Sequence, residues 1–170
     1  ADIDNDGDED LLVANLGANV LLRNDGDTFR SMGADAGLTG SHWSTSAAFL
    51  DYDNDGLLDL YVCNYLAYDT ETAPVCHASD GKSRSYCSPT QFAGVDDQLY
   101  HNLGDGRFAD VSAAAGITGQ QGKGLGVCAV DVDGDGKVDL LVANDTSPTL
   151  LFRNRGDGTL VEDGLRAGIS

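Results

Sequence analysis

The sequence predicts an all-β protein built from repeated units of short strands. Three acidic stretches begin at Asp2, Asp51 and Asp131, and each runs directly into a short apolar segment that ends in Asn. The apolar segments alternate with polar residues or run continuously over too few residues for helices, and glycine separates them throughout. Short strands that recur with the same punctuation are typical of an all-β repeat protein.

Each unit contains the same elements in the same order. An apolar run precedes two of the acidic stretches, at residues 44–50 and 124–130. A strand follows each acidic stretch, at residues 10–15, 59–64 and 139–144. A further strand ends in Asn24, Asn102 or Asn154, and a Gly/Asp turn and a last segment ending in Ala-Gly come after it. The order predicts four antiparallel strands per unit, with the acidic loop between the first and the second.

Four-stranded units that repeat about every 40 to 50 residues are typical of the blades of a β-propeller. The sequence predicts a single repeat domain over residues 1–170 with about three blades. The predicted bounds are 1–40 for a blade that lacks its first strand, 41–118 for a blade with an inserted loop at 65–96, and 119–170 for a third blade. A linear β-solenoid is the alternative, but its coils are generally shorter.

Three blades are too few for a closed ring, because propellers typically have four to eight. We therefore expect either remaining blades of the same chain or neighbouring chains to complete the propeller. In both cases the partner covers blade faces and strand edges that would otherwise promote aggregation.

Charge narrows the classes of partner. The chain has a formal net charge of −18 and a pI near 4.1, which disfavours nucleic acid and anionic membrane surfaces and favours cations. The sequence has no apolar run near the roughly 20 residues needed to span a bilayer, so we expect no membrane insertion.

The acidic stretches carry oxygen ligands at the spacing that a calcium ion requires. Counted from the first Asp, carboxylates occupy positions 1, 3, 5 and 9, and glycine occupies position 6. Alternating carboxylates around a sharp turn, with a backbone carbonyl at position 7, suit the six to eight oxygens that calcium prefers. A helix-loop-helix calcium site would need Glu at position 12, where this chain has Val13, Val62 and Val142. Asp and Gly also favour ordinary turns, but three copies with one spacing predict about three Ca²⁺ ions.

The four cysteines fall into two groups. Cys76 and Cys87 lie in a polar segment and predict a disulfide that closes a short loop in an oxidising compartment, although two free loop thiols are the alternative. Cys63 and Cys128 lie in apolar strands at positions where other repeats have alanine, which predicts small buried core residues.

The motif D-x-D-x-D-G-x-x-D-L, with "LLVAN", "LLFRNRGDGT" and "DVSAAAGI", resembles the FG-GAP/VCBS repeats of integrin α-chain propellers. The segment "YCSPTQFAGVDDQLYHNLGDGRFADVSAAAGITGQQGKGLGV" is more similar to the ASPIC/UnbV, or cartilage-acidic-protein-like, family. The resemblance implies a secreted or cell-surface, calcium-stabilised propeller used in adhesion or matrix contacts. The side-chain ligands that it implies are Asp2, Asp4, Asp6, Asp10, Asp51, Asp53, Asp55, Asp59, Asp131, Asp133, Asp135 and Asp139. The implied carbonyl ligands are those of Asp8, Leu57 and Lys137.

These observations favour a binding or adhesion scaffold for a protein or glycan ligand, with the inserted loop as the contact surface. One alternative is a structural subunit of an extracellular assembly. Another is a carbohydrate-active propeller enzyme, but the metal loops already use almost all of the paired carboxylates, and we expect no catalytic activity.

Four other residues or motifs attract attention without changing this interpretation. The "RGD" at residues 155–157 occupies the same hairpin as "LGD" at 103–105 and is not expected to bind an integrin. His101 is expected to be a strand surface residue, and His77 a loop residue. Trp43 could serve as a sugar platform, but packing within a blade is the favoured interpretation.

Overall fold

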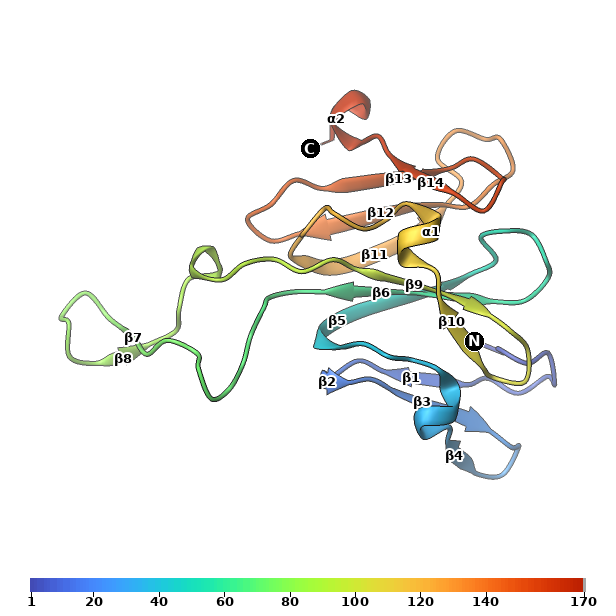
Figure 1. Ribbon diagram of the computed structural model, residues 1–170, viewed down its shortest axis with the longest axis horizontal. Coiled ribbons are helices and arrows are strands. Elements are labelled where there is room, and N and C mark those ends of the chain that lie inside the picture. Colours follow the sequence, from blue (N-terminus) through green and yellow to red (C-terminus); the bar gives the residue numbers. More distant parts are fainter. Residues whose placement is uncertain (170) are drawn as a thin grey trace.

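The computed structural model describes residues 1–169, which form an all-β array of three antiparallel sheets lying side by side (Figure 1). The first sheet contains β1 (Leu11–Val13), β3 (Val20–Asn24) and β4 (Phe29–Ser31). The second contains β5 (Ser41–Leu50), β6 (Asp59–Asn64), β9 (Gln98–Asn102) and β10 (Phe108–Asp110). The third contains β11 (Gly124–Val130), β12 (Asp139–Asn144), β13 (Leu150–Asn154) and β14 (Leu160–Glu162). The array is part of a β-propeller, in agreement with the predicted fold class.

Several elements were not anticipated from the sequence. A short strand, β2 (Leu16–Ala18), leaves the first sheet and pairs with the start of β5, so that Leu16 lies opposite Trp43. Single helical turns follow the last strand of each sheet, at η1 (Gly33–Ala36), α1 (Ser112–Ala115) and α2 (Gly164–Ala167). A further turn, η2 (Pro89–Gln91), lies in the inserted loop.

The core lies between neighbouring sheets and is divided into two clusters by β6. Alternate side chains of β6 point to opposite faces, so that Leu60 and Val62 join the cluster that packs against the first sheet. Tyr61 and Cys63 join the cluster that packs against the third. Every residue of β6 is buried, as expected for a strand that has a blade on each side.

The two outermost faces are exposed, and this corrects one prediction. Leu11 and Val13 on the first sheet are 47% and 43% exposed, and Val130 on the third is 39% exposed. Cys63 is buried as predicted, whereas Cys128 is exposed. Val127 and Ala129 of β11 pack against the second sheet, and because side chains alternate along a strand, Cys128 lies on the opposite face, against which no blade packs among residues 1–169.

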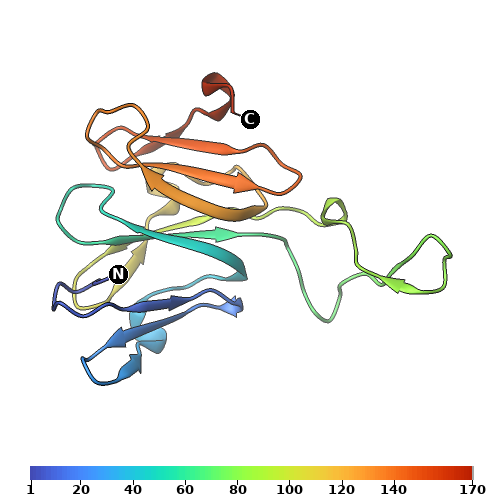
Figure 2. The ribbon, with the colours of Figure 1, turned by 180° about the vertical axis from the view of Figure 1, so that it is seen from behind.

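The inserted loop projects from the end of the second sheet that lies opposite the acidic loops (Figures 1 and 2). It contains a two-stranded hairpin, β7 (Cys76–His77) and β8 (Arg84–Ser85), and the predicted Cys76–Cys87 disulfide. Its base is tied to the third sheet, because the Tyr65 hydroxyl donates to Asp145 at 2.6 Å and Lys123 Nζ donates to the Pro89 carbonyl at 2.9 Å. Within residues 1–169 no helix combines the length and the apolar character needed to cross a bilayer.

Candidate metal centres

The three acidic loops lie along one edge of the array (Figures 1 and 2). In the second and third units the loop connects the first strand to the second, and in the first unit it leads directly into β1. Each loop turns twice through the left-handed region of the backbone, at positions 4 and 6. Position 4 has φ of 59° at Asn5, 61° at Asn54 and 78° at Gly134, and the glycines at position 6 have φ of 84° to 97°. Glycine tolerates this conformation and asparagine is enriched in it. The Asn or Gly at position 4 is therefore part of the motif.

The carboxylate at position 1 closes the loop by accepting hydrogen bonds from backbone amides at positions 5 and 6. Asp2 accepts from Asp6 at 3.1 Å and from Gly7 at 3.0 Å. The same two bonds recur at Asp51 and Asp131, with lengths between 2.9 and 3.2 Å. At position 7, the backbone N–H of Asp8, Leu57 or Lys137 donates to the carboxylate at position 5. Whether the carbonyls at position 7 bind metal stays a prediction.

The carboxylate at position 9 is buried at the start of the next strand. Asp10, Asp59 and Asp139 are each 2% exposed or less. Each accepts the backbone N–H of position 2 and that of the repeated Asn, namely Asn24, Asn102 or Asn154. Burial raises the pKa of Asp59 to about 6, and the hydrogen bonds from Asn102 and Tyr52 oppose that rise.

The structure brings together most, but not all, of the predicted ligands in each loop. Oxygen atoms that lie within 4.8 Å of one another come from Asp2, Asp4 and Asp6 in the first loop and from Asp51, Asp53 and Asp55 in the second. In the third loop they come from Asp131, Asp133 and Asp139. Asp10 and Asp135 are not members of these groups, and the Asp135 carboxylate instead contacts the Lys137 ammonium.

Asp4 provides a test of whether a cation fits. Its side chain is 4% exposed, and neither carboxylate oxygen accepts a hydrogen bond. A buried carboxylate without a hydrogen-bond donor is costly unless a positive charge neutralises it. Burial accordingly raises the pKa of Asp4, although the Arg23 guanidinium opposes that rise. The donor set, carboxylates only, matches the hard oxygen ligands of calcium.

The sequence did not predict the basic or titratable side chains that lie against the loops. Arg23, His101 and Arg153 occupy the same repeat position, immediately before the repeated Asn. Arg23 contacts Asp4 at 2.9 Å, and Arg153 contacts Asp133 at 2.6 Å. His101 was expected to be a surface residue of a strand, but its Nδ1 lies 3.1 Å from Asp59 and 3.4 Å from Asp53, and it joins those two carboxylates as a possible metal ligand. The sequence signal for these contacts was the repeat position that the three residues share. Each of them contacts the Asp at position 3 of the acidic loop in its own unit.

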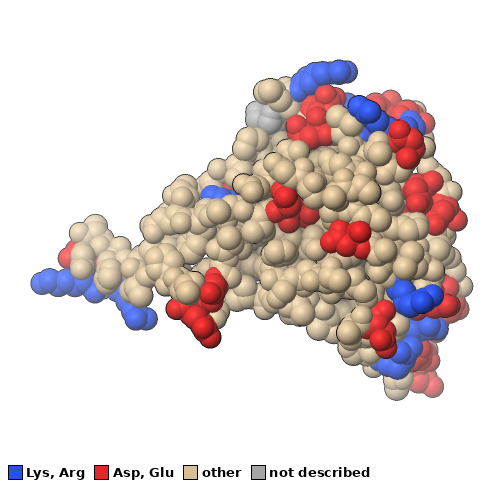
Figure 3. Space-filling view, viewed as in Figure 1, with Lys and Arg blue, Asp and Glu red and all other residues tan. Residues whose placement is uncertain are grey.

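The surface charge follows this arrangement. Acidic side chains interleaved with basic ones gather along the margin that carries the acidic loops, and basic side chains mark the tip of the inserted loop at the far end (Figure 3). Lys82 and Arg84 are the two basic residues of that hairpin.

Stacked antiparallel sheets of three to five strands, each with an acidic loop of one spacing at one edge, define a repeat protein of the propeller class. A family model for the FG-GAP-like repeat matches residues 2–62, 92–142 and 131–167, which together make up more than half of the chain. The chain therefore belongs to the FG-GAP-like repeat family. The one break between the matches, residues 63–91, falls largely in the inserted loop, as expected for a segment that the repeat itself lacks.

Comparison with curated proteins finds similarity to cartilage acidic protein 1. The human protein is 43% identical over 54 residues, and the mouse and Xenopus tropicalis proteins are 41% and 39% identical over the same length. These alignments cover 32% of this chain and 8% of each relative. The chain thus aligns with a small part of these proteins.

Proposed function

We propose that this chain is a calcium-stabilised propeller module whose acidic loops each hold one Ca²⁺ ion. The observation that carries this proposal is the cluster of the Asp2, Asp4 and Asp6 carboxylates, whose oxygens lie within 4.8 Å of one another. Arg23 supplies one positive charge at 2.9 Å from the buried Asp4, which leaves most of the negative charge of the cluster for a cation to neutralise. The recurrence of the same loop geometry at Asp51 and Asp131 extends the proposal to about three ions. In the second and third units the ion would join the first strand to the second, which is a structural role.

Calcium should raise the stability of the chain substantially. At ten times its dissociation constant each ion adds roughly 1.4 kcal/mol, so three ions add about 4 kcal/mol. For a domain of this size the gain corresponds to a rise of roughly 8 to 16 °C in Tm. The measurement is thermal unfolding with calcium and with a chelator, and equal Tm values in the two conditions would contradict the proposal.

Single variants test whether the effect comes from the loops. Asp53→Asn should remove at least one third of the calcium-dependent gain, because it removes a grouped carboxylate of the second loop. Asp35→Asn is the matched control, because Asp35 is an exposed carboxylate in η1 and outside the acidic loops. Equal calcium responses of the two variants would show that the gain arises from general charge screening.

We further propose an extracellular location. The Cys76–Cys87 disulfide supports it, since disulfides persist in oxidising compartments. The similarity to proteins named for cartilage is consistent with it. Detection of the disulfide by mass spectrometry of protein from its natural source tests this, and two reduced thiols would contradict it.

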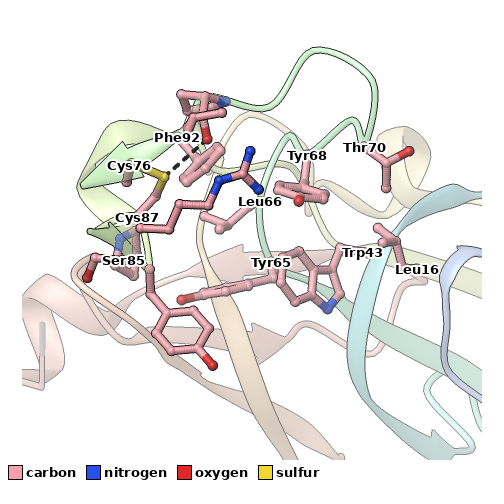
Figure 4. A pocket seen from close by; sticks show the side chains of 15 residues that line it. Leu16, Trp43, Tyr65, Leu66, Tyr68, Thr70, Cys76, Ser85, Cys87 and Phe92 are labelled. Atoms are coloured by element: carbon pink, nitrogen blue, oxygen red, sulfur yellow. Dashed lines mark hydrogen bonds between the residues drawn. A yellow bond between two sulfur atoms is a disulfide. The ribbon is translucent and has the colours of Figure 1, made fainter. Parts of the chain in front are cut away.

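The proposed role is that of a binding scaffold, and the inserted loop supplies the contact surface. Between this loop and the sheets lies an apolar cavity of about 600 Å³ (Figure 4). Trp43 lines it, in edge-to-face contact with Tyr65 at 5.4 Å and with Tyr68 at 5.3 Å between ring centroids. Tyr86 and Val75, which also line the cavity, are 100% and 57% exposed. Exposed aromatic side chains around a hollow favour recognition of a protein or glycan ligand.

Binding by a glycan array and by an extracellular protein library would test this role. Loss of a captured ligand in Tyr86→Ala, but not in Leu103→Ala, would support it. Leu103 is the control because it is also an exposed hydrophobic residue, 53% exposed, and does not line the cavity.

The open outer faces favour a second candidate role, that of a subunit in an extracellular assembly. Leu11 and Val13 on one face and Val130 on the other are exposed hydrophobic strand residues. We propose that further blades, from the same chain or a neighbouring one, cover these faces. Solution mass at several protein concentrations distinguishes an isolated scaffold from a subunit that self-associates.

A further inference from the structure

Two of the three repeated asparagines form hydrogen bonds outside their own unit. The side-chain amide of Asn102 donates to the Leu58 carbonyl at 2.9 Å in its own loop and to the Ile3 carbonyl at 2.8 Å in the preceding loop. Asn154 repeats the pattern one unit later: it donates to Val138 at 3.1 Å and to Tyr52 at 2.7 Å. Ile3 and Tyr52 both occupy position 2 of their acidic loops. The side chain of each asparagine therefore bridges two consecutive acidic loops.

These bonds join the buried carboxylates of all three loops into one path, which we call the loop-to-loop path. Position 2 of each loop also donates its own N–H to the carboxylate at position 9, and each asparagine donates its backbone N–H to the carboxylate of its own loop. The bond lengths along the path are between 2.7 and 3.1 Å. In order, the path contains Asp10, Ile3, Asn102, Asp59, Tyr52, Asn154 and Asp139.

The path is shielded from water. Asn102 and Asp59 are fully buried and Asn154 is 5% exposed. Hydrogen bonds in such an environment are electrostatically stronger than in water, and connected ones polarise one another. A change that holds one group of the path in place therefore limits the motion of the group hydrogen-bonded to it.

We propose that Asn102 and Asn154 couple neighbouring acidic loops, so that binding of Ca²⁺ by one loop increases the affinity of the next. This inference rests on the proposed calcium-binding function. An ion that draws in the carboxylates of one loop orders the peptide at position 2, whose carbonyl holds the following asparagine. The backbone N–H of that asparagine then holds the position-9 carboxylate of the next loop. Binding at the first loop therefore already reduces the conformational entropy of the second loop. The second ion then loses less conformational entropy on binding, which gives positive cooperativity.

Asn24 provides a matched control. Its side chain donates to the Glu9 carbonyl at 3.2 Å and accepts from Gly26 at 3.1 Å, as its counterparts do within their own units. It has no second acceptor among residues 1–169. Asn24→Ala therefore removes the bonds within a unit and leaves the loop-to-loop path complete.

The experiment is calorimetric titration of the full 170-residue chain with Ca²⁺, for the wild type and for Asn154→Ala and Asn24→Ala. We expect a Hill coefficient clearly above 1 in the wild type and in Asn24→Ala, and a value nearer 1 in Asn154→Ala at the same number of bound ions. Equal Hill coefficients in all three proteins would overturn the coupling. Asn102→Ala gives an independent result at the other junction if Asn154→Ala does not fold.

A second measurement tests the coupling by comparing the Ca²⁺ affinities of variants. Asp53→Asn, which disables the middle loop, should weaken Ca²⁺ binding by the remaining loops about fivefold, within the usual range of coupling between sites. In a protein that already carries Asn102→Ala and Asn154→Ala, adding Asp53→Asn should leave the Ca²⁺ affinity of the first and third loops unaltered. A fivefold loss of affinity in that protein would overturn the inference. Calcium bound without coupling refutes this inference alone, whereas the absence of any binding heat refutes the proposed function as well.

Discussion

Each acidic loop has a basic or titratable side chain from a neighbouring strand against its carboxylates. Arg23, His101 and Arg153 lie in β3, β9 and β13. Each of these strands pairs with the strand that begins at or just after the position-9 Asp, so the pairing register sets their positions. The spacing of the carboxylates could be predicted from the sequence because it is local. The cationic partners could not, because their contacts depend on which residues of two strands lie opposite each other.

Arg153→Gln should tighten calcium binding by the third loop about two- to fivefold. The guanidinium pairs with Asp133 and competes with the ion for that carboxylate, and exposed ion pairs of this kind contribute roughly 0.2–1 kcal/mol. Calorimetric titration with calcium measures the change. Arg155→Gln is the control, because Arg155 forms no ion pair among the described residues, and an equal effect of both substitutions would point to net charge instead.

The stability of the chain should fall as pH rises from 4 to 7, in part because of Asp97. Burial raises its pKa to about 6, only partly offset by hydrogen bonds from the Asn64 N–H and the Tyr61 hydroxyl. A pKa higher in the folded state than the ordinary 3.8 means that the folded state binds more protons between these values. The contribution of Asp97 is complete below pH 4 and is lost as pH rises through 6.

The size of this contribution is roughly 2–3 kcal/mol from the difference in pKa. Asp97→Asn keeps an acceptor for Asn64 and does not ionise, so its stability should depend less on pH by that amount. Denaturant unfolding of both proteins in chelator between pH 4 and 7 gives the difference. Parallel pH profiles would contradict the assignment.

At the scale of elements, the strands that repeat were predictable and the unique ones were not. The apolar segments after each acidic loop predicted β6 and β12 with their ends at Asp59, Asn64, Asp139 and Asn144. The strand β2 has no counterpart in the other units, and its pairing with β5 joins residues at least 23 positions apart in the sequence, since the nearest paired residues are Ala18 and Ser41. The hairpin of the inserted loop is likewise unique to one unit, so no periodicity indicated it.

Gly94→Ala should destabilise the base of the inserted loop by several kcal/mol. A Cβ at Gly94 would lie 2.1 Å from the backbone carbonyl oxygens of Gln121 and Gly122, and the backbone cannot give way as a flexible side chain would. Overpacking of this kind typically costs 1–3 kcal/mol, occasionally more. Gly126→Ala is the control, because a Cβ there has no atom within 4 Å. Hydrogen exchange of residues 65–96 measures the local destabilisation of the loop, and the Tm measures the loss of overall stability. Equal Tm values for the two variants would contradict the close approach of Gly94 to the backbone of Gln121 and Gly122.

At the scale of the whole molecule, the number of blades determined which cysteine is buried. Cys63 lies between the second and third sheets, whereas Cys128 lies on the outer face of the third. The sequence predicted both as buried, because each lies in an apolar strand. Which face of such a strand another blade covers depends on the place of the strand in the array. This difference could not be read from either strand alone.

Thiol labelling tests this arrangement. In the folded chain Cys128 should react with an aromatic disulfide reagent within minutes, whereas Cys63 should react only after unfolding. Burial also raises the pKa of the Cys63 thiol, which reduces its reactive thiolate. Protection of Cys128 in a larger assembly would identify the outer face as a covered surface, and equal labelling of both cysteines in the folded chain would contradict the fold.

The asparagine bridges give the array a polarity. Every bridge runs from a side chain in the later unit to a carbonyl in the earlier one, and both junctions use the same two kinds of group. An additional unit spliced between two others would bring one donor and one acceptor in the correct sense, and removal of a unit would leave a matching pair behind. This hydrogen-bonding scheme therefore tolerates gain or loss of whole units by gene duplication or deletion, with no compensating substitution at the new boundary.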